Sequence, residues 1–178
     1  MNVDKVVLDI RRLAIASDSF QQALSLLDHL QHLNLDINSD IYSPIMAGVV
    51  TTYAKNFNRA DGLGPLPKSY LEFENEVLAV AHKQVIDSRN TLYSHRDLTK
   101  APLSIIDAYK VQVWIENEHF LFKPNMVDLR PDRLEDIKKL VEYQQSRLKD
   151  DFDKKLISLK LENKYEENKV YILGQDFP

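Results

Sequence analysis

The chain has 178 residues, of which 44% are hydrophobic and 28% charged, which suits one folded domain rather than a disordered chain. Its 23 Lys and Arg against 27 Asp and Glu give a net charge of −4, which excludes a uniformly basic nucleic-acid-binding coat but not a local basic patch. Cysteine is absent, which excludes disulfides, thiolate metal sites, iron–sulfur clusters and a cysteine nucleophile.

The count of four glycines argues against a glycine-rich phosphate loop and against an all-β fold with many turns. No apolar run approaches the roughly 18–20 residues that a membrane span needs. The first residues hold acidic side chains among the apolar ones and lack the apolar stretch of a signal peptide. We therefore expect a cytoplasmic protein without membrane contact, with a single domain over residues 1–178.

Apolar residues at spacings of three and four predict a helix over residues 3–16 and a second over residues 19–33. Ser17 and Asp18 stand between the two, and both residue types are good helix N-caps. The sequence thus predicts a break in the helix at this point.

Asp40 is expected to cap a third helix, with Pro44 in its first turns, where a missing N–H costs little. That helix is apolar on nearly all sides up to Tyr53, which predicts a central buried position. Residues 58–70 hold two glycines and two prolines and are predicted to form a loop.

A fourth helix is predicted over residues 71–94 and a fifth over residues 133–160. Between them, residues 109–123 alternate between two faces around a polar turn, which is typical of a β-hairpin. The expected fold is mainly α, an up-and-down bundle of about five helices with one β-hairpin near 109–123.

The stretch with the clearest chemical pattern is Arg89, the polar Asn90 and then His95, at the predicted end of the fourth helix. An Arg-polar pair followed a few residues later by His resembles the signature of the HEPN superfamily of helical ribonucleases and nucleotide-binding proteins. The His-Arg-Asp ending at 95–97 is similar to HEPN-like proteins of the abortive-infection type. The upstream block TTYAKNFNRADGLGPLP resembles the buried helix and Gly/Pro loop that precede the motif helix in those proteins.

This resemblance covers about residues 40–100. It implies a helical fold, a homodimer, RNA as substrate, and a role in phage defence or in a toxin–antitoxin pair, with an antitoxin or another protein as partner. One departure is Lys55-Asn56, where family members often carry Arg-Pro.

The residues themselves suit RNA cleavage without a metal or another cofactor. His95 is the candidate general acid–base, because an imidazole titrates near neutral pH. The Arg89 guanidinium stays cationic and can stabilise the charge that develops on the phosphate, while Asn90 can orient the histidine or bind a phosphate oxygen. Arg96, Lys55 and Arg59 are candidate RNA-binding cations.

Helix geometry limits this scheme within one chain. On a straight helix, residues 89 and 95 lie about 120° apart around the axis and about 9 Å apart along it. Their side chains converge only if the helix ends near Ser94 or if a twofold dimer brings two sets into one cleft. We therefore expect a homodimer that buries the end of this helix.

Other interpretations of these residues remain open at this stage. Basic residues in the last turn of a helix are favoured by its dipole, so Arg89 and His95 are also consistent with plain C-terminal cations. The same fold without catalysis, as a module that binds nucleotide, RNA or a protein, is the alternative function, and a purely structural helical domain is a third.

Further candidates are weaker. His29 and His32 are three residues apart and could bind a metal, but a solvated helix face is the simpler interpretation. His82 is expected at the surface or as a hydrogen-bonded core residue. An acidic run on the fifth predicted helix is expected to be a solvated face; it consists of Asp150, Asp151 and Asp153. The aromatic residues of the predicted hairpin could stack on bases or pack on the bundle; they are Trp114, Phe120 and Phe122.

Overall fold

A computed structural model describes residues 3–35, 39–58, 63–90, 111–116, 119–124 and 133–163, and it confirms a mainly helical protein. The described part has four α-helices, two short 3₁₀ turns and two strands. In chain order these are α1 (Val3–His32), α2 (Tyr42–Ala54), η1 (Lys55–Phe57), η2 (Lys68–Leu71), α3 (Glu76–Ser88), β1 (Val111–Glu116), β2 (His119–Pro124) and α4 (Leu134–Asn163).

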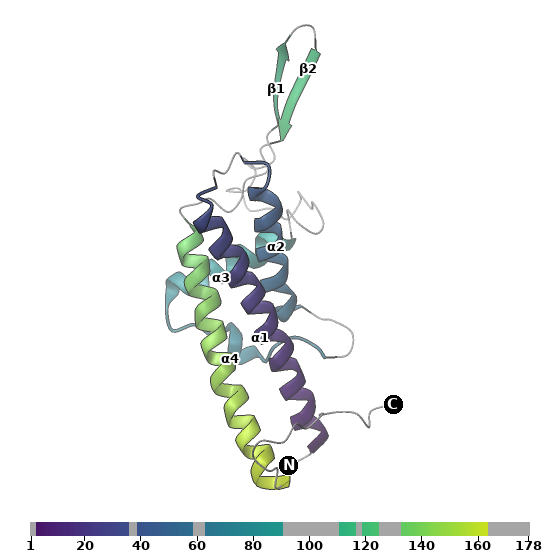
Figure 1. Ribbon diagram of the computed structural model, residues 1–178, viewed down its shortest axis with the longest axis vertical. Coiled ribbons are helices and arrows are strands. Elements are labelled where there is room, and N and C mark those ends of the chain that lie inside the picture. The colour runs from purple at the N-terminus through teal and green to yellow at the C-terminus, as the bar shows by residue number, and fades with distance from the viewer. Residues whose placement is uncertain are drawn as a thin grey trace.

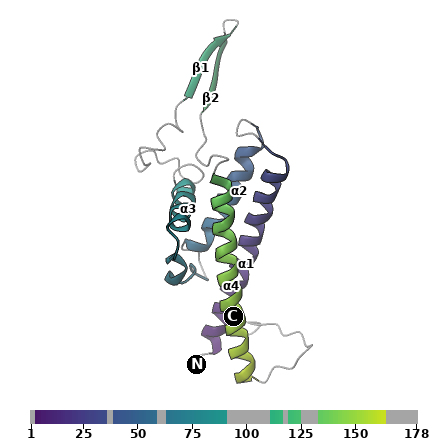
Figure 2. The same ribbon diagram turned by 90° about the vertical axis from the view of Figure 1, so that its left-hand side faces the viewer.

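The four helices form a bundle in which α1 and α4 are the long members (Figure 1). They lie side by side in both views, and their ends extend past α2 and α3 on the side away from the strands (Figure 2). One continuous core fills the bundle, and its largest fully buried side chains include Phe20, Leu27, Leu30, Met46, Tyr53, Tyr70, Ile137, Leu140 and Leu148.

The break expected at Ser17 and Asp18 is wrong, because α1 runs through both residues as one helix of 30 residues. Ser17 Oγ accepts a hydrogen bond of 3.0 Å from Gln145 Nε2 on α4, and Asp18 accepts one of 2.7 Å from Gln22 one turn later. Neither side chain caps a helix. The apolar stripe continues in phase across this point, and its packing on α4 outweighs the weak local preference of Ser and Asp for a cap. The stripe consists of Leu13, Ala16, Phe20, Ala23, Leu27 and Leu30.

The cap expected from Asp40 is also wrong. The residue before α2 is Ile41, and no side chain caps this helix. After α2, the nearly buried Asn56 donates from Nδ2 to the carbonyl of Tyr53 at 3.1 Å, and its own carbonyl accepts from the N–H of Leu66 at 2.8 Å. Asn56 thereby ties the loop after α2 back onto the helix end.

The fourth predicted helix begins later than expected, at Glu76 instead of residue 71. The residues before it form the turn η2 and a short extended segment. Asn75 is the N-cap, and its Oδ1 accepts from the N–H of Val77 at 2.8 Å. After Ser88 the chain forms a π-helical turn at Arg89 and Asn90; the expected continuation over 91–94 lies outside the described residues.

The two strands pair antiparallel over residues 111–116 and 119–124. Val111 faces Pro124, Val113 faces Phe122, and Ile115 faces Phe120 across the ladder. Both views show this hairpin beyond the end of the bundle at which α3 ends, clear of the four helices (Figures 1 and 2).

We expect Asn75→Ala to destabilise the protein by about 1 kcal/mol, because it removes a cap hydrogen bond. Asp18→Ala is the matched control: its carboxylate bonds only along one exposed helix face in the described structure, so the free energy of unfolding should change by less than about 0.5 kcal/mol. Urea denaturation of both variants measures the difference. A loss of about 1 kcal/mol in Asp18→Ala would mean that α1 is capped at this point after all.

Candidate functional site

The predicted Arg–polar pair lies at the carboxyl end of α3. Arg89 is half-buried and donates from Nη1 to Asn90 Oδ1 at 2.9 Å, while Asn90 is exposed. The backbone N–H of Arg89 still bonds to the carbonyls of Ile86 and Val85, so the guanidinium is attached to an ordered helix end. A π turn of this kind inside or at the end of a helix is frequent at functional sites.

Three of the predicted site residues, His95, Arg96 and Arg59, lie outside the described residues. Their predicted roles therefore stay predictions.

Lys55 is described, and it is exposed at the start of η1, directly after α2. Tyr53, two residues earlier, contacts His82 on α3, and Arg89 follows His82 by two helical turns, or about 10 Å. Phe57, two residues after Lys55, also contacts His82, so the chain on both sides of Lys55 packs against the middle of α3.

The sequence leaves open whether His82 lies at the surface or is a hydrogen-bonded core residue. Its Nδ1 lies 2.8 Å from the Tyr53 hydroxyl, and its ring lies between the rings of Phe57 and Phe73, with centroids 4.7 and 5.1 Å away. Burial lowers the pKa of His82 to about 4, so the imidazole is neutral at pH 7. His82 is therefore a half-buried, hydrogen-bonded residue at the edge of the core, and Val85, three residues later, is fully buried.

The buried polar contacts continue from Tyr53 into α4. Burial raises the pKa of Tyr53 far above its ordinary value, and a side-chain hydrogen bond from Gln144 partly offsets that effect. Gln144 is fully buried and donates from Nε2 to the carbonyl of Tyr70 at 2.9 Å. One polar network thus joins α2, α3, α4 and η2, and Arg89 extends from one of the helices that it holds.

Tyr70 makes a further tie to α4, since its hydroxyl donates to Asp151 Oδ2 at 2.7 Å. Burial raises the pKa of this tyrosine, and the hydrogen bond to Asp151 raises it further. The acidic run on α4 is therefore only partly a solvated face: Asp150 and Asp153 are exposed, whereas Asp151 holds η2.

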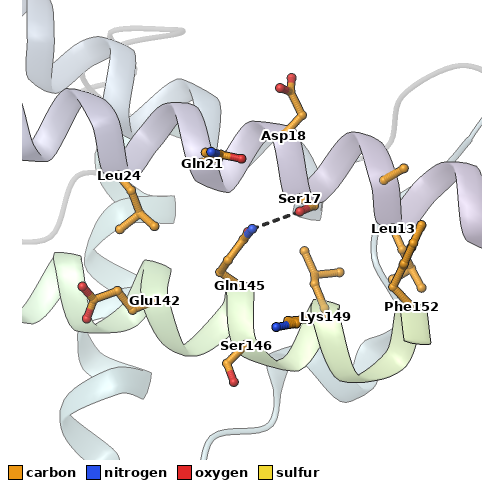
Figure 3. A pocket seen from close by; sticks show the side chains of 12 residues that line it. Leu13, Ser17, Asp18, Gln21, Leu24, Glu142, Gln145, Ser146, Lys149 and Phe152 are labelled. Atoms are coloured by element: carbon orange, nitrogen blue, oxygen red, sulfur yellow. Dashed lines mark hydrogen bonds between the residues drawn. The ribbon is translucent and has the colours of Figure 1, made fainter. Parts of the chain in front are cut away.

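A groove of about 730 Å³ lies between α1 and α4 (Figure 3). Leu13, Leu24 and Phe152 form apolar walls, and the hydrogen bond from Gln145 to Ser17 crosses it. It is lined by residues of α1 and α4 alone, with no histidine among them, so it is separate from the end of α3.

The described residues contain no group of three His, Asp or Glu side chains that could hold a metal ion. His29 and His32 are both exposed, and the Nδ1 atom of His29 lies 2.6 Å from the carbonyl of Ser25. None of the described helices is long and apolar enough to cross a membrane.

No protein-family model, curated protein or solved structure matches this chain. The resemblance to HEPN proteins therefore stays a prediction from the residues of the sequence motif.

The environment of His82 predicts an acid-sensitive fold. Its pKa is about 4 in the folded protein and near 6.5 in the unfolded chain, so the unfolded state binds the proton first as the pH falls. The contribution of neutral His82 to the free energy of unfolding is complete above about pH 7. It is lost as the pH falls from about 6.5 towards 4. After allowance for partial exposure, we expect a loss of about 1 kcal/mol between pH 7 and pH 5.

Thermal unfolding at pH 7 and pH 5 measures this effect in wild type and in His82→Gln, which keeps a hydrogen-bonding group but does not titrate. The pH dependence should be smaller in His82→Gln and unchanged in His32→Gln, an exposed control. Equal pH dependence in wild type and His82→Gln would contradict the assignment.

Proposed function

We propose that this protein is a metal-independent endoribonuclease of the HEPN type, with Arg89, Asn90 and His95 at a cleft between two copies of the chain. The single observation that carries the proposal is the end of α3, where a half-buried Arg89 bonds to an exposed Asn90 at 2.9 Å. That bond holds one edge of the guanidinium, and its other N–H groups suit the oxygens of a phosphate.

The reaction that suits these residues is attack of the RNA on itself. The 2′-oxygen forms a bond to phosphorus as His95 accepts its proton, and the bond from phosphorus to the 5′-oxygen breaks as His95 of the partner subunit donates a proton to that oxygen. The products are a 2′,3′-cyclic phosphate and a 5′-hydroxyl. Arg89 stabilises the negative charge on the phosphate oxygens in the transition state.

A second copy is part of the proposal because Arg89 and His95 are six residues apart. Continued as a helix, the chain would separate them by about 120° around the axis and about 9 Å along it. A twofold axis beside the end of α3 supplies the missing member of each pair. Arg96, Arg59 and the exposed Lys55 are proposed to bind RNA phosphates.

We expect His95→Ala to lower the rate of RNA cleavage by about 100- to 10,000-fold, because it removes the group that moves the proton. The melting temperature should stay nearly unchanged. Cleavage of total RNA by wild type and variant, in EDTA, is the measurement. His32→Ala, another exposed histidine on a helix, is the matched control and should cleave like wild type.

Two outcomes of the same cleavage assay would contradict the proposal. Full cleavage by His95→Ala would end the catalytic assignment, and so would loss of wild-type cleavage in EDTA. If wild type cleaves no RNA, the protein is a non-catalytic module, and direct binding of nucleotide, RNA or a protein becomes the function to test.

Arg89→Ala should lower the cleavage rate and also weaken RNA binding, with a shallower dependence of the binding constant on salt, because one phosphate contact is lost. Arg89→Lys keeps the charge but loses the planar guanidinium. Compared with Arg89→Ala, it should therefore restore the salt dependence of RNA binding more than the cleavage rate. Lys83→Ala removes an exposed cation from the same helix and is the control. If Lys83→Ala lowered the cleavage rate and the RNA affinity equally, α3 would act only through its total positive charge.

A further inference from the structure

The groove between α1 and α4 has an apolar interior and a polar rim. Leu24 and Phe152 lie at its opposite ends in Figure 3, and each is only partly buried against the core. The bond from Gln145 to Ser17 crosses the groove between them and pairs one polar group from each wall. The rim consists of exposed polar and charged side chains from both helices, namely Asp18, Gln21, Glu142, Ser146 and Lys149.

Both ends of the groove are bounded by contacts that hold α1 and α4 together. One turn beyond Leu24, Asp28 accepts a hydrogen bond of 2.7 Å from Lys138 Nζ, and this ion pair joins the two helices. At the other end, Phe152 of α4 packs against Val6 and Ile10 of α1. The groove is therefore formed by a fixed pair of helices before anything binds to it, as binding sites usually are.

The α4 wall of the groove carries two unpaired charges of opposite sign. Glu142 lies beside Leu24, and Lys149 lies towards Phe152 (Figure 3). These two charged residues are seven positions apart, which is about two helical turns or 10 Å along the axis. Neither forms an ion pair within the described residues, and Asp18 on the opposite wall forms none there either. An occupant with a positive and a negative charge about two turns apart would complement this wall.

We propose that this groove binds an amphipathic helix of a partner protein. Its apolar side chains, at spacings of three and four, insert between Leu24 and Phe152. A basic residue of the helix faces Glu142, and an acidic residue about seven positions away faces Lys149. The helix axis lies about 8–10 Å from those of α1 and α4, as in ordinary helix packing. The proposal does not depend on RNA cleavage, because the groove is separate from the end of α3.

The layout of the groove disfavours other occupants. A small molecule would stay in contact with water along the exposed rim, whereas small-molecule sites bury most of the surface of their ligand. Nucleic acid is disfavoured because the rim holds two carboxylates and one ammonium group. A second copy related by a twofold axis through the groove would place one hollow against another, which leaves both unfilled.

The test begins with a phage-displayed library of amphipathic helical peptides that is selected on the wild-type protein. We expect the enriched peptides to share apolar residues at helical spacing, with a basic and an acidic residue about two turns apart. Fluorescence anisotropy then measures binding of the most enriched peptide, in labelled synthetic form, to wild type and variants. A selection that enriches no peptide overturns the proposal.

Two tryptophan variants on α1 distinguish the groove from the rest of the surface. Ala14→Trp fills the groove and should weaken peptide binding by about tenfold or more. Arg11→Trp places the same side chain one turn away at an exposed position outside the groove, and it should bind like wild type. Circular dichroism checks that both variants keep the helical bundle. Peptide binding that survives Ala14→Trp, or that falls equally in Arg11→Trp, overturns the proposal.

A charge variant tests recognition at the rim. Lys149→Glu should weaken peptide binding by about fivefold, the size expected for an exposed ion pair, and a peptide whose acidic residue is changed to Lys should recover the loss. Lys83→Glu changes an exposed cation on α3 and should leave peptide binding unchanged. An equal loss in both variants would mean that the peptide responds only to total charge, which contradicts the proposal.

Two further measurements on the purified protein examine the competing occupants. Light scattering should give the same mass for wild type and Ala14→Trp, and a dimer that dissociates in this variant would assign the groove to a second copy. Native mass spectrometry should show no small molecule that wild type retains and Ala14→Trp loses. Either opposite result overturns the proposal. A peptide that binds in the groove of a protein that cleaves no RNA supports the groove and contradicts only the proposed function.

Discussion

The position of α3 depends on the hydrogen bond between His82 and Tyr53. This helix fully buries only Ala81, Val85 and Ser88, and Leu78 and Ile86 pack against the core while partly buried. The imidazole lies among aromatic rings and bonds at 2.8 Å to a hydroxyl with no exposed surface. The same hydroxyl is also hydrogen-bonded by Gln144, so Tyr53 connects α2 to both α3 and α4. Arg89 lies about two helical turns beyond His82, at the end of the same helix.

The residues that stabilise the bundle are different from those of the candidate site. The long helices α1 and α4 supply much of the core, and polar ties such as Tyr70 to Asp151 and Gln144 to the Tyr70 carbonyl fix the adjoining turn. Arg89 and Asn90 lie outside this core, at a helix end whose hydrogen bonding is already irregular. A helix end of this kind can present a charge without a large cost in folding free energy.

Cap residues show why local sequence signals succeed in one place and fail in another. Asn75 caps α3 because the segment before it is extended, which leaves the first N–H groups of the helix without backbone partners. Ser17 and Asp18 have the same preference, but each helical turn around them already has backbone partners and buries apolar side chains against α4. A cap is worth about 1 kcal/mol, and burial of one Leu or Phe side chain exceeds it.

The sequence by itself determined the mainly helical composition, the apolar stripes of each helix and the spacing of Arg89, Asn90 and His95, because these depend on residues a few positions apart. Its alternation of residues over 109–123 overlaps β1 and β2 for the same reason. Only the tertiary structure decided that α1 is continuous and that the half-buried His82 bonds to Tyr53. Each of these depends on contacts between segments distant in sequence, where packing against a neighbouring helix competes with local preference and is larger in free energy.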